Sequence, residues 1–289
     1  MSDIFAAHIT PNIIMMAEKL QNNKLEHTCF PQPADSTVRV WRYLDLAKFI
    51  WLLENQKLYL SGVASLNDQH EGSKPKFLAD YDDQQHLAIT RHQLLREFGN
   101  ELGEEKFRTE IPRIVEQNSQ IHAHQQRERR MLYVNCWHLG NPESEAMWRL
   151  YCPENNGVAI QTSYSKLAES TANDPELYIG QVTYIDYESQ GFPPSNIFYP
   201  VMHKRISFAH EKEVRLVKIR VPDDCGFPQE FCPPGIAIDW PLEATIEGIY
   251  VGPYAPEYFY NVVHAIVRSF APNLESQVHW SKMRAPPYY

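Results

Sequence analysis

The stretch His203–Arg220, HKRISFAHEKEVRLVKIR, is the part of the sequence around which the rest is organised. From Val214 onward its apolar residues are mostly β-branched and at first alternate with charged ones, which predicts a β-strand over 213–221. The alternation shifts by one residue near Leu216 and Val217, and such a shift is typical of a β-bulge. We therefore expect a bulged strand, preceded by a cluster of charged side chains.

Two carboxylates stand at the head of this strand. If Glu211 and Glu213 both belong to it, their side chains lie on the same face. In a partly buried site they could not both ionise without cost, and such pairs serve acid–base or electrostatic catalysis. The alternative is a solvated strand start at which both glutamates pair with Lys212, Arg205 or Arg215. Spacing alone favours this alternative.

Composition bounds the class of protein. With 289 residues and 43% apolar residues, the chain can form one large domain or two small ones. The net charge of −9 argues against nucleic-acid binding over the whole surface, although it leaves room for one local basic groove. The five cysteines form no CxxC pair, which predicts no zinc site and suits a reducing compartment. With no signal peptide or transmembrane span visible, we expect a cytoplasmic protein without membrane contact.

The chain divides into three predicted parts. Residues 1–37 read as an N-terminal arm, with a short helix around Met15, Met16 and Leu20. Residues 38–77 and 131–289 form a mixed α+β core with mostly antiparallel strands. Residues 78–130 are polar and helical in pattern, with Leu94, Leu95, Phe98 and Leu102 on one face and an interruption at Pro112. This insert predicts a helical subdomain that serves as a lid or as a surface for a protein partner.

The core contains about seven strands and three amphipathic helices. The strands are expected at 38–44, 57–60, 131–138, 157–162, 178–187, 213–221, 236–240 and 246–251. One helix follows Asp45 as N-cap, and another follows Asn141 with Pro142 in its first turn. The last begins at Pro256 and buries Phe259, Val262, Val263, Ile266 and Phe270.

Two further groups of side chains are candidates for a cleft. The loop Ser65–Gly72 contains Asn67, Asp68 and Glu71, which predicts an Asx-type turn in preference to a site for a hard metal ion. The corner between 131–138 and the next helix should bring Trp137, His138, Trp148 and Tyr151 together. The alternative is an aromatic core, which we expect for Met147 and one of the two tryptophans, whereas His138 at the strand end is better placed to be exposed.

Several motifs, in chain order, resemble those of the uncharacterised family DUF2971. They are Trp41-Arg42-Tyr43, Leu58-Tyr59-Leu60-Ser61, Ser65-Leu66-Asn67-Asp68 with Glu71, Cys136, Met147-Trp148-Arg149-Leu150-Tyr151, Gly157-Val158-Ala159-Ile160, Lys204 with His210–Arg215, and Ile249–Pro253. The resemblance covers most of residues 38–270. It implies no function, since that family has none assigned.

A more remote resemblance is to ADP-ribosyltransferase-like domains, whose entry is also a strand with a basic residue, a helix and a second strand. It implies that Arg42 binds the pyrophosphate or ribose of NAD, and that Tyr43, Tyr151 or Trp137 stacks on the nicotinamide. Glu213 would contact the ribose and stabilise the oxocarbenium-like state, as carboxylates do in glycosidases.

The same resemblance gives the remaining roles. Glu211 would orient or deprotonate the acceptor. The Ser-Thr-Ser motif of that class is absent and Cys136-Trp137-His138 stands in its place, so His138 would have to supply the missing hydrogen bond. Lys204 and Arg205 are further cleft candidates.

Three functions follow as hypotheses. The first is an NAD-dependent ADP-ribosyltransferase or NAD glycohydrolase that acts on a protein or nucleic acid, in a bacterial toxin or in phage defence. The second is a metal-dependent nuclease, with Asp68, Glu71, Glu211 and Glu213 as Mg²⁺ ligands and Lys204 or Lys212 on the phosphate. The third is a non-enzymatic binding module of a defence system that uses the insert 78–130.

Overall fold

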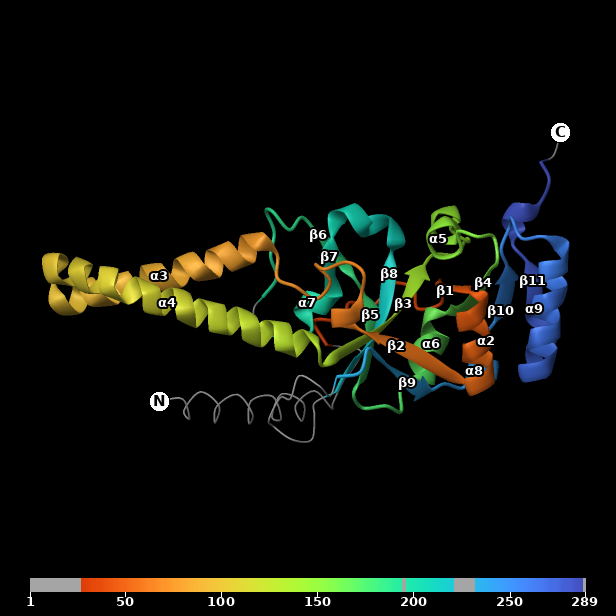
Figure 1. Ribbon diagram of the computed structural model, residues 1–289. Coiled ribbons are helices and arrows are strands. Elements are labelled where there is room, and N and C mark those ends of the chain that lie inside the picture. The colour runs from red at the N-terminus through yellow and green to blue at the C-terminus, as the bar shows by residue number, and fades with distance from the viewer. Residues whose placement is uncertain (1–26, 194–195, 221–231, 288–289) are drawn as a thin grey trace. The chain divides into compact units, whose positions relative to one another are not determined.

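The computed structural model describes residues 27–193, 196–220 and 232–287, so the expected helix around Met15 and Leu20 lies outside the described residues. The same is true of Cys225, and the other four cysteines are free thiols. The chain forms two compact units (Figure 1). Unit 1 comprises residues up to Gly62, then Tyr133–Val182 and the chain from His210 onward, and unit 2 comprises Val63–Leu132 and Thr183–Ala209.

Unit 1 is built on a mixed, mostly antiparallel sheet, which confirms the predicted α+β class. Its strands are β1 (Arg39–Asp45), β2 (Lys57–Gly62), β3 (Leu132–Leu139), β4 (Gly157–Ser163), β5 (Leu177–Gln181), β8 (Glu213–Ile219), β9 (Gly235–Asp239), β10 (Gly248–Val251) and β11 (Val278–Trp280). They are ordered β11-β10-β4-β1-β3-β2-β9, and β8 joins β3 to β5. β10 and β11 pair in parallel, whereas the pairings of β1 with β3 and β4, of β2 with β3 and β9, of β4 with β10 and of β5 with β8 are antiparallel.

The middle of β3 lies between two pairings. Near its C-terminal end β3 pairs with β1, with Trp41 opposite His138. Near its N-terminal end it pairs with β2, with Ser61 opposite Val134. The segment 135–137 therefore runs past the place where β1 and β2 part.

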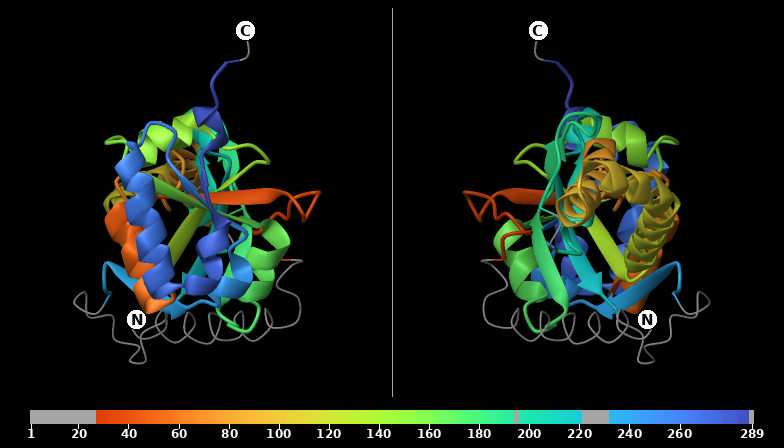
Figure 2. Two further views of the ribbon diagram at one scale, coloured as in Figure 1. Left: turned by 90° about the vertical axis from the view of Figure 1, so that its right-hand side faces the viewer. Right: turned by 90° about the vertical axis from the view of Figure 1, so that its left-hand side faces the viewer.

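Four helices cover the apolar core of unit 1. They are α2 (Leu46–Asn55), α6 (Tyr164–Ser170), α8 (Leu242–Thr245) and α9 (Glu257–Phe270), and their buried residues join those of the strands in one cluster. Figure 2 shows α2 in orange beside α9 in blue. The predicted cap is confirmed, because the side chain of Asp45 accepts a hydrogen bond from the Lys48 amide at 2.8 Å.

A smaller cluster contains the helix α5 (Glu145–Tyr151), which packs Met147 and Trp148 against Trp41 and Tyr43. The predicted start of this helix at Asn141 is wrong. Ser144 is its N-cap. The side-chain oxygen of Asn141 instead accepts a hydrogen bond from the backbone amide of Arg39.

Two other strand and helix predictions are corrected. The pairing of β8 with β5 contains no bulge, because Ile179 pairs with Leu216 and Tyr178 with Val217 in regular register. The run Val214–Val217 is buried on both faces of the sheet. A strand of this kind can carry apolar residues at successive positions, so its sequence departs from strict alternation without a bulge. On α9, Val262 and Phe270 are exposed and Val267 is buried instead, since the core contacts a narrower face than the pattern suggests.

Unit 2 consists of a helical hairpin and a small parallel pair of strands. The hairpin is α3 (Lys76–Phe98) and α4 (Asn100–Arg129), joined at Gly99, whose φ of 77° favours glycine. The pair is β6 (Thr183–Ile185) and β7 (His203–Arg205), with the short helix α7 (Tyr199–Met202) before β7. The expected strand 178–187 is therefore two strands, β5 and β6, which pair with different partners.

The hairpin differs from its prediction in two respects. α4 continues through Pro112, because a proline in an exposed turn costs the helix one internal hydrogen bond without ending it. On the predicted apolar face, Phe98 and Leu102 are exposed and only Leu94 and Leu95 are half-buried. Polar contacts, such as those of His86 with Asn118 and Arg91 with Glu104, join the two helices instead. Within the described ranges, none of the helices has the length and apolar character needed to cross a bilayer.

Candidate functional site

The first candidate group lies across β1, β3 and β8 of unit 1, which are neighbouring strands. Arg42 on β1 is half-buried, and its Nη1 donates to the carbonyl of Cys136 at 2.9 Å. Burial lowers the pKa of this guanidinium and its neighbours Cys136 and Tyr151 partly offset the effect, so the group still carries a full charge at neutral pH. No carboxylate in the described part of the chain lies within ion-pair distance of Arg42. It is a partly desolvated cation that lacks a counter-ion there.

The strand pleat decides which predicted residues share a face. Val214 and Leu216 of β8 lie in the same core cluster as Trp137 of β3. Their neighbours Glu213 and His138 therefore point to the opposite face of the sheet.

Trp137 is not part of the expected aromatic corner. Its ring lies 6.0 Å from that of Trp240, and its Nε1 donates to Asn135 at 2.7 Å. Successive residues of a strand point to opposite faces, and Trp137 takes the core side, away from the cluster of Met147 and Trp148. A core position was the expected alternative for one of the two tryptophans.

His138 is buried, which corrects the expectation that it is exposed. β3 is an inner strand, so its end is covered as well as its middle. Nδ1 lies 2.7 Å from the carbonyl of Glu211 and donates to it, which leaves Nε2 as an acceptor. Burial lowers the pKa of His138, the bond to Glu211 partly offsets this, and Lys212 and His210 lower the pKa further. The imidazole is therefore neutral at pH 7.

The two tyrosines expected near a nicotinamide differ in exposure. The ring of Tyr43 is buried, and its centre lies 4.9 Å from that of Trp148. Its hydroxyl oxygen accepts a hydrogen bond from the backbone amide of Ser144. Burial raises the pKa of Tyr43. Tyr151, at the end of α5, is 47% exposed, so its ring is the more accessible one.

The two glutamates do not share a strand face as predicted. Glu211 ends the 3-10 helix η4 (Ile206–Glu211), β8 begins at Glu213, and Lys212 between them has a left-handed φ of 42°. The alternation rule fails because Glu211 precedes the strand.

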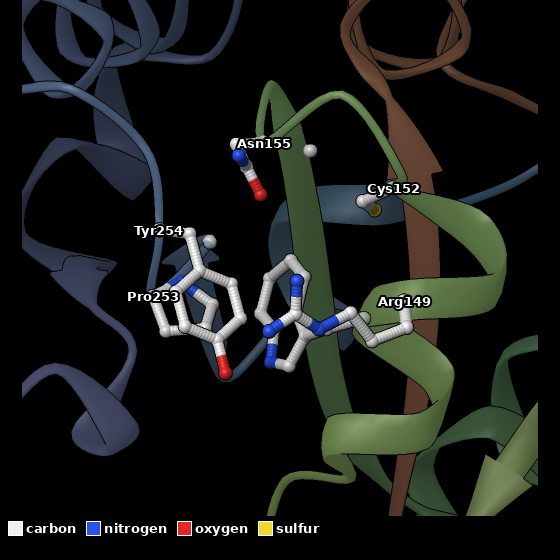
Figure 3. A pocket seen from close by; sticks show the side chains of 8 residues that line it. Arg149, Cys152, Asn155, Pro253 and Tyr254 are labelled. Carbon is white, nitrogen blue, oxygen red and sulfur yellow. The ribbon is translucent and has the colours of Figure 1, made fainter.

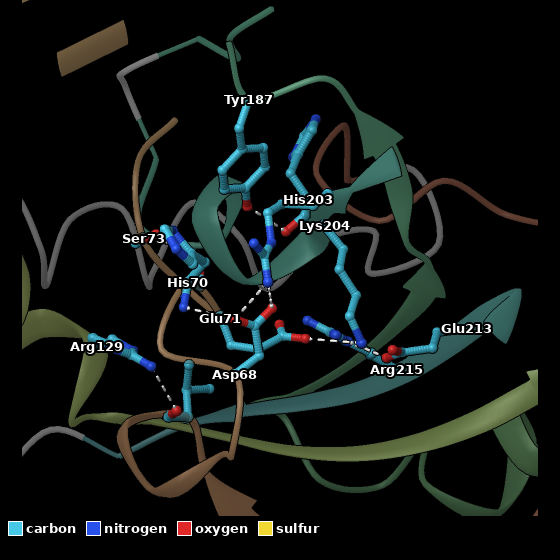
Figure 4. A network of polar contacts seen from close by, with 12 residues as sticks. Asp68, His70, Glu71, Ser73, Arg129, Tyr187, His203, Lys204, Glu213 and Arg215 are labelled. Atoms are coloured by element: carbon cyan, nitrogen blue, oxygen red, sulfur yellow. Dashed lines mark hydrogen bonds and ion pairs between the residues drawn. The ribbon is translucent and has the colours of Figure 1, made fainter. Parts of the chain in front are cut away.

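Both glutamates are buried, and Glu213 accepts a hydrogen bond from Nε of the fully buried Arg215 at 2.7 Å (Figure 4). Pairing with Arg215 was the expected alternative to a catalytic pair, but it occurs in a buried position. A carboxylate that accepts a hydrogen bond from a guanidinium is held in one orientation.

The second group, in unit 2, is a cluster of ion pairs (Figure 4). Lys204 lies 3.0 Å from Glu71, and both side chains are at most 9% exposed. Arg205 Nη2 donates to both carboxylate oxygens of Asp68, at 3.0 and 3.1 Å. Each acid is thus held by a cation from β7.

The loop that carries these acids forms the predicted turn. The carboxylate of Asp68 accepts the amide of His70 at 3.0 Å, which is an Asx turn, while Asn67 is exposed. Burial raises the pKa of Asp68, but the His70 amide and Arg205 outweigh it, so the net pKa is lowered.

Arg129, in the last turn of α4, was missed as a member of this cluster. Its Nη2 donates to the carbonyl of Val63 at 3.3 Å. Burial lowers its pKa, and the charges of Glu71 and Asp68 oppose that shift. In the sequence Arg129 belongs to a basic run that is typical of a solvated helix end, and no local signal separates it from its neighbours.

A small, shallow pocket, partly open to solvent, lies between α5 and the loop after β10 (Figure 3). The guanidinium of Arg149 lies 4.1 Å from the ring centre of Tyr254 and closes one side. Burial raises the pKa of the Cys152 thiol at its wall to about 12. Of the side chains expected in the aromatic corner, Trp148 lines this pocket, whereas Trp137, His138 and Tyr151 do not.

The first group offers, on adjacent strands, a cation for which the described residues supply no counter-ion, a neutral imidazole with a free acceptor nitrogen, and a glutamate fixed by Arg215. By the strand pleat, the Cβ atom of Arg42 falls with Val40 and Leu44 on the core face of the sheet, whereas His138 and Glu213 take the other face. Among the described residues, no three His, Cys, Asp or Glu side chains converge as metal ligands. Comparison with family models, with curated proteins and with solved structures gives no match for this chain.

Proposed function

We propose that unit 1 binds NAD and cleaves the bond between nicotinamide and ribose, with the ADP-ribosyl group passing to water or to a macromolecular acceptor. The observation that carries the proposal is the state of Arg42. The guanidinium of Arg42 is partly desolvated, donates to one carbonyl and, within the described ranges, has no carboxylate beside it, which favours an anionic ligand. A pyrophosphate suits it well, because the planar fork binds two oxygens at once.

The choice of NAD among anions rests on the resemblance to ADP-ribosyltransferase-like domains. β1, α2 and β2 follow one another as strand, helix and strand, with Arg42 on the first strand. Glu211 precedes β8 and Glu213 is its first residue, and β8 is a neighbour of β3. DUF2971 membership, proposed on the motifs quoted above, adds no function of its own.

Each residue of the first group then has a role. Glu213, fixed by Arg215, stabilises the positive charge that develops on the ribose as the bond from C1′ to nitrogen breaks. The bonding electrons leave with nicotinamide, which becomes neutral. The acceptor oxygen bonds to C1′ and gives its proton to Glu211.

Two side chains position the ligand. Nε2 of His138 accepts a hydrogen bond from a ribose hydroxyl or the carboxamide. The exposed ring of Tyr151 offers a stacking surface for the nicotinamide, a role for which Trp137 and Tyr43 are less suited because both rings are packed in clusters.

The proposal is tested with two variants and a matched control. Glu213→Gln keeps the shape and an acceptor for Arg215 but removes the charge, so nicotinamide release should fall about 100-fold or more. Arg42→Lys keeps a donor for the Cys136 carbonyl but loses the fork, so the Kd for NAD should rise about tenfold. Glu275→Gln, which removes a partner of Arg268 on the surface, should change neither.

Nicotinamide is followed by chromatography and NAD binding by calorimetry, on variants whose circular dichroism matches the wild type. If the wild-type protein neither binds NAD nor releases nicotinamide, the proposal is wrong. Equal release by wild type and Glu213→Gln would remove Glu213 from the mechanism.

The metal-dependent nuclease has less support. Asp68 and Glu71 each pair with a cation, as does Glu213, so these acids are committed to ion pairs instead of converging. The binding-module hypothesis is favoured by one observation, the exposed apolar side chains of the hairpin in unit 2.

A further inference from the structure

Glu143, in the loop between β3 and α5, accepts hydrogen bonds from two distant parts of unit 1. Its Oε2 accepts Nε1–H of Trp148 at 3.0 Å and the hydroxyl of Ser281 at 2.5 Å. Its Oε1 accepts the backbone amide of Lys282 at 2.8 Å. Trp148 and Ser281 are almost completely buried. A carboxylate suits this position, because it offers two acceptor oxygens and no donor to three converging donors.

The segment that supplies Ser281 and Lys282 is fixed to the edge of the sheet. It follows β11, which pairs with β10, and the amide of Ser281 donates to the carbonyl of Val251 at 2.9 Å. The carboxylate of Glu143 is therefore bound to backbone that continues from the sheet, and it offers a fixed acceptor to Trp148.

The other partner of this carboxylate is α5, a helix of only seven residues. The start of α5 is tied to β1, because the amide of Ser144 donates to the hydroxyl of Tyr43 at 2.8 Å. The middle of α5 is tied to Glu143 through Trp148, whose ring packs edge-on against that of Tyr43. A helix this short depends on such tertiary contacts, so the bond to Glu143 helps to fix its rotation and place.

Tyr151 connects α5 to the site proposed above. Burial lowers the pKa of the Arg42 guanidinium, and Cys136 and Tyr151 raise it, so the phenol of Tyr151 lies close to that cation. Tyr151 follows Trp148 by three residues, and residues at this spacing lie on the same side of a helix. A shift or rotation of α5 at Trp148 therefore moves the ring of Tyr151 as well.

We propose that Glu143 is a positioning residue for NAD, which sets the place of the stacking ring of Tyr151 by holding α5 through Trp148, an inference that rests on the proposed function. Glu143 itself touches neither the ligand nor the bond that breaks. The two glutamates assigned to the cleavage step lie on η4 and at the start of β8, outside this link. Loss of Glu143 should therefore weaken NAD binding and leave the cleavage step intact.

The test compares KM and kcat for nicotinamide release. Glu143→Gln replaces one acceptor oxygen by a donor amide, so at least one of the three hydrogen bonds is lost. We expect the KM for NAD to rise about tenfold with kcat within about twofold, because stacking stabilises bound NAD and the transition state alike. Trp148→Phe, which removes only the indole N–H from the link, should have the same effect. Glu257→Gln, a change of the same kind in an exposed pair with Arg284, should alter neither constant.

A purely structural role of Glu143 would give a different result. It would lower the fraction of folded enzyme, so kcat would fall while KM stayed the same, and the inference would be overturned with the proposed function intact. The double variant Glu143→Gln with Tyr151→Ala traces the effect to the tyrosine, and its KM should be no higher than that of Tyr151→Ala alone. Additive increases in KM would mean that Glu143 acts elsewhere, which also overturns the inference. A wild type that does not turn over NAD would instead reject the proposed function, and the positioning role with it.

Discussion

At the scale of single residues, burial explains why His138 is neutral and why its titration should affect stability. Its pKa is below the ordinary value of 6.5, first because the ring is desolvated. Between pH 6.5 and that lower pKa, the unfolded chain binds a proton that the folded chain does not. The free energy of unfolding therefore falls as the pH drops through this window.

His138→Asn tests this origin of the pH dependence. The asparagine amide can still donate to the Glu211 carbonyl, as Nδ1 does now, but it does not titrate. We expect the stability of the variant, measured by urea unfolding from pH 7 to pH 5, to decline less steeply than that of the wild type. Burial also lowers the pKa of His203 and His27, so the wild type retains part of its slope in any case.

Exposed His92 on α3 provides the matched control. His92→Asn should leave the slope unchanged, and a slope as steep in His138→Asn as in the wild type would mean that His138 contributes nothing to it.

At the scale of elements, the junction between η4 and β8 depends on one residue in an unusual conformation. Lys212 has a φ of 42°, which costs a residue with a side chain about 1 kcal/mol and a β-branched residue more. Its carbonyl accepts the amide of Leu139, so the conformation also ties β8 to β3. The turn fixes the backbone of both neighbouring glutamates.

Lys212→Gly and Lys212→Val should therefore differ in stability. Glycine adopts this φ without strain, whereas valine does not, and we expect the valine variant to unfold about 2 kcal/mol more easily than the glycine variant. The measurement is the free energy of unfolding in urea. Equal free energies of unfolding would mean that the turn changes its conformation in the valine variant. A comparison of nicotinamide release by the two variants would then show whether the proposed roles of the two glutamates depend on the turn.

The same junction shows what a sequence pattern can predict and where it stops. β1, α2, β2, β3 and β4 were predicted because each has the right period, a cap or a clear end. Glu211 and Glu213 were misplaced because Lys212 between them was taken to be extended. Nothing in the local sequence indicates that this lysine has a left-handed backbone conformation. The strand 178–187 was taken as one because its apolar run continues, although β5 and β6 serve different sheets.

The site residues follow the same division. Arg42 was predicted from its strand, but its lack of a counter-ion depends on tertiary contacts. Trp137 and His138 are adjacent in the sequence, and only the packing of β3 decides which of them enters the core. Arg129 reaches its cluster from the far end of a long helix, and such a contact has no signature in the sequence.

At the scale of the whole molecule, unit 2 is made of two segments that are far apart in the chain, 63–132 and 183–209. Among the described residues, three ion pairs link them: Glu71 with Lys204, Asp68 with Arg205, and the exposed pair of Lys76 with Glu188. The first pair is almost completely buried. Removal of one charge from a buried pair leaves the other in a poorly solvated position, which typically costs about 3 kcal/mol.

Glu71→Gln should therefore destabilise unit 2 by about 3 kcal/mol, and the effect should extend to both of its segments because the pair joins them. Hydrogen exchange followed by mass spectrometry measures it, with faster exchange expected in α3, α4, β6 and β7 together. Glu145→Gln is the matched control, since it removes the same charge from an exposed pair with Arg149 and should leave exchange unchanged. Faster exchange confined to the loop around residue 71 would show that the pair holds only that loop, and that the two segments are joined by their apolar contacts, such as those of Leu78 with Ile185 and Phe192.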